Sequence, residues 1–405
     1  MNTFLRGQLL EPEDRSFRYH PDALITIVDG KIQQVEETPS DCTIPISHPN
    51  CILLPGFTDS HIHFPQTNVC GSASGPLLPW LKKTVFPEEA KFADNSYANE
   101  VLEVFCESLV RSGVCAAAIF SSSHYSATDI LFQGLERSGI KALAGMTLMN
   151  RNAPSNILTD VEQAKKEMQT LIADWHGKDN DRLRYCITPR FAIACDERML
   201  QMAGDLSKEH NLWVQTHISE NNDEIEFIKS LFPDLQNYLH VYDHFGLLHE
   251  RSLYAHCIHF SDKDWKQFSD ANAVVTHCPD SNFFLGSGCM EYNKARSFGA
   301  KMSIGTDVGA GRSFSMRLAT ARGYDASLLV GSPVPAEELL WSATIGGAIH
   351  LQFNRPWSDS ADADIIAIPV ENSKTKSRII DNILFQHDHP TVQATYVRGT
   401  CVYSV

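Results

Sequence analysis

Short apolar runs recur through the middle of the chain, and each ends in polar residues and is followed by a longer segment with helical periodicity. This alternation is typical of parallel β-α units. It predicts eight strands, at Ile52–Asp59, Val114–Phe120, Lys141–Met146, Arg184–Thr188, Leu212–Thr216, Ser252–His256, Ala273–His277 and Lys301–Gly305. Eight such units favour a closed, TIM-like (β/α)₈ barrel, in which the groups that bind ligands stand at the C-terminal ends of the strands.

The pattern changes at both ends of the chain. Phe4–Gln8, Ala23–Val28 and Lys31–Val35 alternate apolar and polar residues as antiparallel hairpins do, and Ala363–Ile368 and Ala394–Tyr403 also predict strands. Each end is too small to bury a core alone. We therefore expect residues 1–51 and 355–405 to form one small composite β-sandwich domain beside a barrel over residues 52–354.

A long insertion follows the first predicted barrel strand. Residues 66–95 contain no strand pattern. Segments of this length within a compact domain are usually lids or binding loops. The insertion is therefore expected to be a functional lid or a binding loop.

Composition limits the classes of binding partner and the cellular compartment that the sequence predicts. The 405 residues carry a formal charge of −15, which disfavours binding to nucleic acid or to anionic membrane surfaces. No stretch approaches the roughly 18 apolar residues of a membrane span, and the first ten residues lack the pattern of a signal peptide. Eleven cysteines without a Cys-x-x-Cys motif suit reduced core thiols. These features predict a cytoplasmic protein.

Candidate metal ligands gather at the ends of the predicted strands. His61 and His63 stand two residues apart, so that their side chains share one face of a strand. His217, His256 and Asp307 close three later strands of the same barrel. A lone strand-end histidine is more often a hydrogen-bonding residue than a ligand, but five candidates at one mouth favour a metal site. Four of them suffice for one ion, which four is left open, and imidazole with carboxylate favours Zn²⁺ or Fe²⁺.

The predicted chemistry is hydrolysis with a single metal. An open metal site can supply hydroxide at neutral pH. A second metal would need a bridging anion, often a modified lysine at the end of the fourth strand, where this chain has Arg190. Glu220, three residues after His217, is a candidate proton shuttle, with a helix-capping role as the alternative. His124 is a further possible site histidine, although a polar loop is favoured there.

Several motifs make a more specific comparison possible. The chain resembles the guanine deaminases, a family of the amidohydrolase superfamily. The resemblance runs from about residue 50 to 320 and is carried by these blocks: Pro55-Gly56-Phe57-Thr58-Asp59-Ser60-His61-Ile62-His63-Phe64-Pro65-Gln66, Leu78-Pro79-Trp80-Leu81, Thr84-Val85-Phe86-Pro87, Met149-Asn150-Arg151-Asn152-Ala153-Pro154, Thr188-Pro189-Arg190-Phe191, His277-Cys278-Pro279-Asp280-Ser281-Asn282 and Gly305-Thr306-Asp307-Val308-Gly309-Ala310-Gly311.

The resemblance implies a role for each site residue. The implied ligands of one zinc ion per subunit, with Fe²⁺ as the other metal considered, are His61, His63, His217 and Asp307. The resemblance also implies that His256 lies beside the attacking water and that His256 or Asp307 takes the water's proton. It implies that Glu220 protonates the substrate. The implied residues around the purine are His63, Gln66, Trp80, Arg190, Phe191, His217, Glu220 and Asp307. Of these, Arg190 and Gln66 would bind the keto edge and Phe191 the ring, while Trp80 either closes over the base or belongs to the lid core.

The implied activity is the hydrolytic deamination of guanine to xanthine in purine catabolism, by a homodimer. Its nearest alternative is a deaminase of a related oxo-purine or pterin, such as 8-oxoguanine or isoxanthopterin. A cyclic-amide hydrolase should show the bridging lysine that is absent here. A silent scaffold barrel would have no reason to keep so many polar groups in one mouth.

Overall fold

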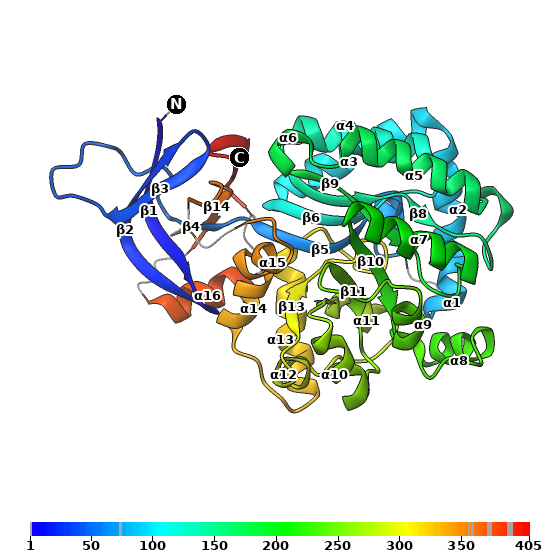
Figure 1. Cartoon of the computed structure of the whole chain (residues 1–405). Helices are drawn as coiled ribbons and strands as arrows, with labels where there is room; N and C mark the ends of the chain where they lie inside the picture. The colour runs from blue at the N-terminus through cyan, green and yellow to red at the C-terminus, as the bar shows by residue number, and fades with distance from the viewer. Residues whose placement is uncertain (1, 73–74, 355–356, 358–359, 371–374, 387–391) are drawn as a thin grey trace.

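The computed structural model describes residues 2–72, 75–354, 357, 360–370, 375–386 and 392–405. Its larger unit is a parallel sheet whose eight main strands follow one another in chain order and curl into a nearly closed barrel (Figure 1). Its strands are β5 (Phe57–His63), β6 (Val114–Phe120), β7 (Lys141–Gly145), β9 (Leu183–Pro189), β10 (Trp213–Ile218), β11 (Ser252–His256), β12 (Val274–His277) and β13 (Lys301–Ile304), with a short β8 (Thr147–Leu148) beside β9. The predicted (β/α)₈ barrel is confirmed.

Helices follow the strands and cover the outside of the barrel (Figure 1). They are α3 (Asn95–Arg111), α4 (Tyr125–Ser138), α5 (Val161–Trp175), α6 (Lys178–Asp181), α7 (Glu197–His210), α8 (Asn222–Leu231), α9 (Tyr238–His244), α10 (Asp262–Asp270), α11 (Pro279–Phe284), α12 (Tyr292–Ser297), α13 (Met316–Leu329), α14 (Ala336–Ala343) and α15 (Ile345–His350), with a 3-10 turn at Ser155–Ile157. None of the helices in the described ranges has the length and apolar character needed to cross a membrane.

The inside of the barrel holds its own apolar cluster, which forms the floor of the mouth. It consists of Ala116, Ala118, Leu143, Cys186, Trp213, Leu253, Val274, Ala348, Leu351 and Phe353. On β6 the same face continues from Ala118 to Phe120, whose ring centroid lies 4.9 Å from that of His61. Because side chains alternate along a strand, the residues above this floor point into the mouth.

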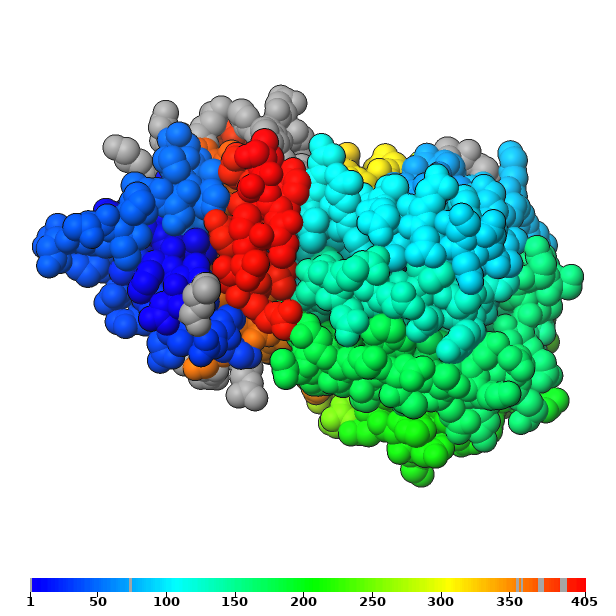
Figure 2. Space-filling view, turned by 90° about the horizontal axis from the view of Figure 1, so that it is seen from above, coloured from blue at the N-terminus to red at the C-terminus, as the bar shows by residue number. Residues whose placement is uncertain are grey.

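The two chain ends meet in a separate sheet of seven strands, as expected. Its order is β16 (Thr400–Ser404), β15 (Ala394–Val397), β14 (Ile365–Pro369), β4 (Cys51–Pro55), β1 (Asn2–Glu13), β2 (Ser16–Val28) and β3 (Lys31–Glu37). The helix α16 (Lys376–Phe385) lies between β14 and β15 in the chain. Figure 2 shows the C-terminal segment, in red, between the N-terminal strands and the barrel.

The first predicted barrel strand, Ile52–Asp59, is wrong as a single element, because it is two strands broken at Gly56. Strand β4 pairs with β1 and β14 in the small sheet, whereas β5 pairs with β6 in the barrel. A Cβ added at Gly56 would lie 2.3 Å from the Sγ of Cys115, so only glycine lets the chain pass there. The change of unit expected after residue 51 therefore falls at Gly56, and the change expected at residue 355 lies outside the described residues.

The C-terminal strand predicted over Ala394–Tyr403 is also two strands. The chain turns at Arg398 and Gly399, which both have positive φ, and β15 and β16 pair as a hairpin. The turn at Asp29 and Gly30, which joins β2 to β3, likewise has two residues of positive φ. Both turns match the preference of tight hairpins for residues that tolerate left-handed backbone.

A buried group of charges joins the small sheet to the base of the barrel. Asp362 and Asp364 precede β14, and both contact the side chains of Lys141 on β7 and Arg182 before β9. Lys141 and Arg182 are each 3% exposed. Burial by itself would raise the pKa of Asp362, but the neighbouring cations, chiefly Lys141, lower it to about 2.

This pairing predicts a specific loss of stability in acid. A carboxyl whose pKa is lower in the folded than in the unfolded protein stabilises the fold above its ordinary pKa, and that contribution is lost as pH falls from about 4 to about 2. We expect the urea midpoint of the unmodified protein to fall more steeply across this range than that of Asp362→Asn. Parallel curves for the two proteins would contradict the prediction.

The insertion after β5 is a series of short helical turns rather than a loop. It contains α1 (Leu77–Trp80) and α2 (Phe86–Glu89), with 3-10 or π turns at Phe64–Val69, Leu81–Val85 and Ala90–Ala93. Residues from both helices are almost fully buried, among them Trp80 and Glu89. The insertion is therefore a packed part of the structure over the barrel mouth.

Candidate active site

The end of β5 places two imidazoles inside the barrel mouth. His61 and His63 are 1% and 3% exposed. Two residues earlier, the buried carboxylate of Asp59 accepts hydrogen bonds from the backbone NH and the hydroxyl of Thr306, at 3.0 and 2.5 Å. The NH of Asp307 donates to the carbonyl of His61 at 2.8 Å. These contacts fasten the last barrel strand to the first, so that Asp307 faces both histidines.

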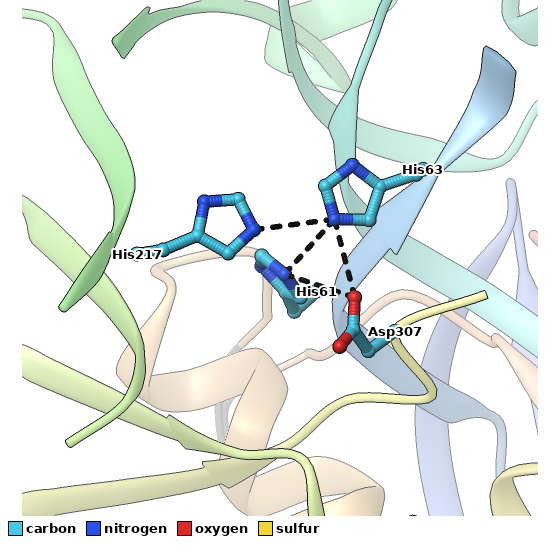
Figure 3. Close-up of side chains that lie close together, drawn as sticks. All are labelled: His61, His63, His217 and Asp307. Atoms are coloured by element: carbon cyan, nitrogen blue, oxygen red, sulfur yellow. Dashed lines mark hydrogen bonds and ion pairs between the residues drawn. The ribbon is translucent and has the colours of Figure 1, made fainter. Parts of the chain in front are cut away.

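Four side chains converge there, as Figure 3 shows for His61, His63, His217 and Asp307. The Nε2 atom of His63 lies 3.2 Å from Nε2 of His61, 3.3 Å from Nε2 of His217 and 3.2 Å from Oδ1 of Asp307. Oδ1 of Asp307 is 3.4 Å from Nε2 of His61. Donors at about 2.0–2.1 Å from a tetrahedral centre are roughly 3.3 Å apart. The four donors that the resemblance implied therefore have the spacing of ligands to one ion.

The hydrogen-bonding state of the imidazoles supports the same conclusion. Nδ1 of His217 lies 2.6 Å from the carbonyl oxygen of Arg190, to which it can only donate, and this leaves a lone pair on Nε2. Burial lowers the pKa of His61 to about 4 and that of His217 well below its ordinary value, so both rings are neutral at pH 7. Neutral rings whose lone pairs converge on a carboxylate fit a divalent cation.

His256 stands beside this group and is held in a fixed orientation. Its Nδ1 lies 2.9 Å from Oδ1 of Asn282, an oxygen that accepts the ring N–H. Its Nε2 is buried, hydrogen-bonds to no described residue, and lies 3.4 Å from Oε2 of Glu220 and 3.9 Å from Oδ2 of Asp307. His256 also has a φ of +76°, an unfavourable conformation for a residue with a side chain. Its Nε2 therefore faces Glu220 and Asp307 at the mouth of the barrel.

Glu220 is set apart from helix capping by its neighbours. Asn221 is the N-cap of α8, and Glu224 completes the capping box. Glu220 is 2% exposed, and its Oε1 accepts a hydrogen bond from the hydroxyl of Ser287 at 3.0 Å. Burial raises the pKa of Glu220 to about 7. A carboxyl with this pKa both accepts and releases a proton near neutral pH.

Most of these groups line one pocket. Its wall comprises His63, Gln66, Leu77, Trp80, Leu81, Arg190, Phe191, His217, Glu220, Glu224, His256, Leu285, Asp307 and Ala310. Every residue expected around a purine is therefore brought to the same pocket. Trp80 combines both readings left open by the sequence, because it lines the pocket and also donates from its indole N–H to the carbonyl of Ser72 within the insertion.

Some residues of this site have roles that the sequence analysis did not assign. Asn282, Ser287 and Asp59 act through hydrogen bonds to His256, Glu220 and Thr306. Glu89 bonds to Gln66 and Arg190 from the insertion, directly after the Phe86-Pro87 block. His124 is absent from the residues that line the pocket, in agreement with the polar-loop interpretation. A search for polar residues next to the family blocks would have singled out Glu89.

Comparison with known proteins agrees with this geometry. Residues 52–402 match the model of the amidohydrolase family. The guanine deaminase of Escherichia coli is 33% identical over 96% of this chain and 92% of its own, and that of Dictyostelium discoideum is 32% identical over 86% and 82%. The crystal structure of guanine deaminase from C. acetobutylicum with bound guanine in the active site superposes with a TM-score of 0.94, at 30% identity, over the whole of both chains.

Proposed function

Because this chain belongs to the amidohydrolase family, we propose that it catalyses the reaction for which its closely similar relatives are named, the hydrolytic deamination of guanine. Guanine and water would give xanthine and ammonia, with a C–O bond formed and the C–N bond of the amino group broken at C2. The observation that carries the proposal is that four metal-type donors converge beside one pocket, whose wall also includes Glu220 and Arg190.

The proposed metal ligands are His61, His63, His217 and Asp307. A divalent cation held there, which we propose to be zinc, would supply a nucleophile at neutral pH, because such an ion lowers the pKa of bound water to about 7. The acidic partner of the reaction is Glu220, which donates its proton to the ring nitrogen adjacent to C2. We propose that His256 Nε2 or Asp307 Oδ2 accepts the proton that the water releases, and their position beside Glu220 supports this.

The leaving group explains why a carboxyl with a raised pKa is needed. An amino group departs only after it has been protonated, so the site must deliver protons on the side of the pocket that faces C2. Glu220 lies beside His256 and is kept from water by its burial, which supports this role. We propose that Glu220 shuttles protons in both halves of the reaction.

We propose that the base is recognised by pocket residues other than the metal ligands and Glu220. Arg190 and Gln66 are proposed to bind the keto edge of guanine, and Phe191 and Trp80 to contact its ring. A guanidinium that donates to an oxo group is left without an acceptor when an amino group takes that place, which can reject the wrong base by orders of magnitude. Adenine is therefore expected to be inert.

Metal removal gives the first test. We expect a chelator to abolish ammonia release from guanine, and Zn²⁺ or Fe²⁺ to restore it, because the nucleophile depends on the ion. Elemental analysis should find one metal per chain in the active protein, and Asp307→Ala should lose it. Full activity of a preparation free of metal would refute the proposal.

The choice of substrate is tested by one assay on a panel of bases. We expect guanine to be the best substrate among guanine, 8-oxoguanine, isoxanthopterin, cytosine and adenine, as followed by ultraviolet absorbance and ammonia release. A higher kcat/KM for 8-oxoguanine or isoxanthopterin would move the assignment to a related deaminase. The homodimer stays a prediction, and light scattering in solution would test it.

A further inference from the structure

We propose that Glu89 determines base specificity, by fixing the hydrogen-bonding polarity of Gln66 and the direction of the Arg190 guanidinium so that the pocket selects a lactam edge. This inference rests on the proposed function, and it adds to it a residue from the insertion that lines no part of the pocket wall. Glu89 ends α2 and is 2% exposed, so its carboxylate is shielded from water.

Both carboxylate oxygens of Glu89 are used by the residues assigned to the keto edge. Oε1 accepts from Nε2 of Gln66 at 3.1 Å, and Oε2 accepts from Nη1 of Arg190 at 2.6 Å. The same helix contacts the guanidinium from another side, since Cζ of Arg190 lies 5.4 Å from the ring centroid of Phe86. The helix α2 thus holds Arg190 by charge and by an aromatic face.

The carboxylate decides which end of the Gln66 amide faces which way. An ionised carboxylate only accepts hydrogen bonds, so the NH₂ of Gln66 must face Glu89. The opposite end of the amide, Oε1, is then left as an acceptor. It lies beside Gly309 in the loop that follows Asp307, where an added Cβ would come within 1.9 Å of it. Gln66 is therefore an acceptor on the side away from Glu89.

The guanidinium of Arg190 has the opposite hydrogen-bonding character from the Gln66 oxygen. It carries five N–H donors and has no acceptor, and Glu89 fixes the direction of the planar group through Nη1. The remaining donors can meet an oxo group. Together the two side chains offer an acceptor and a donor, which match the ring N–H and the C=O of guanine's lactam edge. A 6-aminopurine presents the reverse pattern, a ring nitrogen that accepts and an amino group that donates.

The decisive experiment compares guanine with 2,6-diaminopurine, because both carry the amino group at C2 and differ at position 6. We expect Glu89→Gln to lower kcat/KM for guanine mostly through KM, and to lower the guanine to 2,6-diaminopurine ratio of kcat/KM by at least about tenfold. A neutral amide at position 89 can accept from Arg190 while donating to the amide oxygen of Gln66, so Gln66 can turn its NH₂ toward the base. The metal content should be unchanged.

Glu88→Gln is the matched control. Glu88 precedes Glu89 on the same helix and is also buried, but it bonds to Lys91 at 2.6 Å and to the hydroxyl of Tyr97. We expect this variant to leave the ratio unchanged. If Glu89→Gln fails to fold, Glu89→Asp keeps the charge with a shorter reach, and an intermediate fall of the same ratio is expected.

The outcomes separate this inference from the proposed function. An unmodified protein that releases no ammonia from guanine contradicts the proposed function. An unmodified protein that deaminates guanine, with a Glu89 variant that loses rate on both bases by the same factor, overturns the inference and leaves Glu89 a structural residue. A fall of the ratio in the Glu89 variants alone supports the inference.

Discussion

Glu220→Gln is expected to keep its metal and to lose about 10²- to 10⁴-fold of kcat on guanine, the range over which a positioned proton donor contributes. The amide has almost the shape of the carboxyl and can accept a hydrogen bond from Ser287, which now bonds to Oε1 of Glu220. It cannot carry a proton to the ring nitrogen or to the departing amine. The measurements are steady-state kinetics by ultraviolet absorbance and metal content by elemental analysis.

The control is Glu226→Gln on the same side of the barrel. Glu226 lies on α8, and its side chain is 71% exposed and pairs only with Lys229 among the described residues. We expect its kcat to equal that of the unmodified protein. Undiminished turnover in Glu220→Gln would remove Glu220 from the mechanism, and loss of the metal in that variant would reassign it as a ligand or as a support of one.

Arg182→Met is expected to lower the free energy of unfolding by about 3–5 kcal/mol, because it removes one partner from a buried group of charges. Nη1 of Arg182 lies 3.0 Å from Oδ2 of Asp362 and 3.4 Å from Oδ2 of Asp364, and its Nη2 donates to the carbonyl of Gly139 at 2.6 Å. The variant leaves the carbonyl and part of the carboxylate charge without donors. Urea unfolding followed by circular dichroism measures the change.

Lys31→Met makes the matched comparison, because Lys31 pairs with the same Asp362 from the surface. Its side chain is 55% exposed, so water screens the pair. Exposed ion pairs contribute about 0–1 kcal/mol, and we expect a change in that range. Equal losses in the two variants would show that burial adds nothing to the contribution of Arg182.

The sequence alone predicts the barrel because its eight strands are buried on both faces and therefore contrast clearly with the amphipathic helices that follow them. It could not divide the run at Gly56. A glycine inside a strand pattern does not by itself show that the two halves join different sheets, and only the pairing of β4 with β1 and β14, and of β5 with β6, shows that the chain changes sheets there. The hairpin at Arg398-Gly399 was missed because a short turn interrupts one continuous β-type pattern.

For the site, the residues at strand ends can be identified from the sequence, because the geometry of a barrel brings those ends together. His61, His217 and Asp307 are found in this way and meet as expected. Glu89 could not be found by the same reasoning, because it lies on a helical turn of the insertion, 101 residues from its partner Arg190. Tertiary packing decides which oxygen of Glu89 faces Gln66 and which faces Arg190, and no local sequence pattern predicts it.

Arg190 contacts the two halves of the site through different atoms. Its carbonyl oxygen orients His217, whereas its guanidinium reaches Glu89 and the pocket. A carbonyl group is present whatever side chain the residue bears. A substitution at this position can therefore alter base preference while His217 keeps its tautomer. Substrate preference can change in evolution without a change in the metal-binding residues.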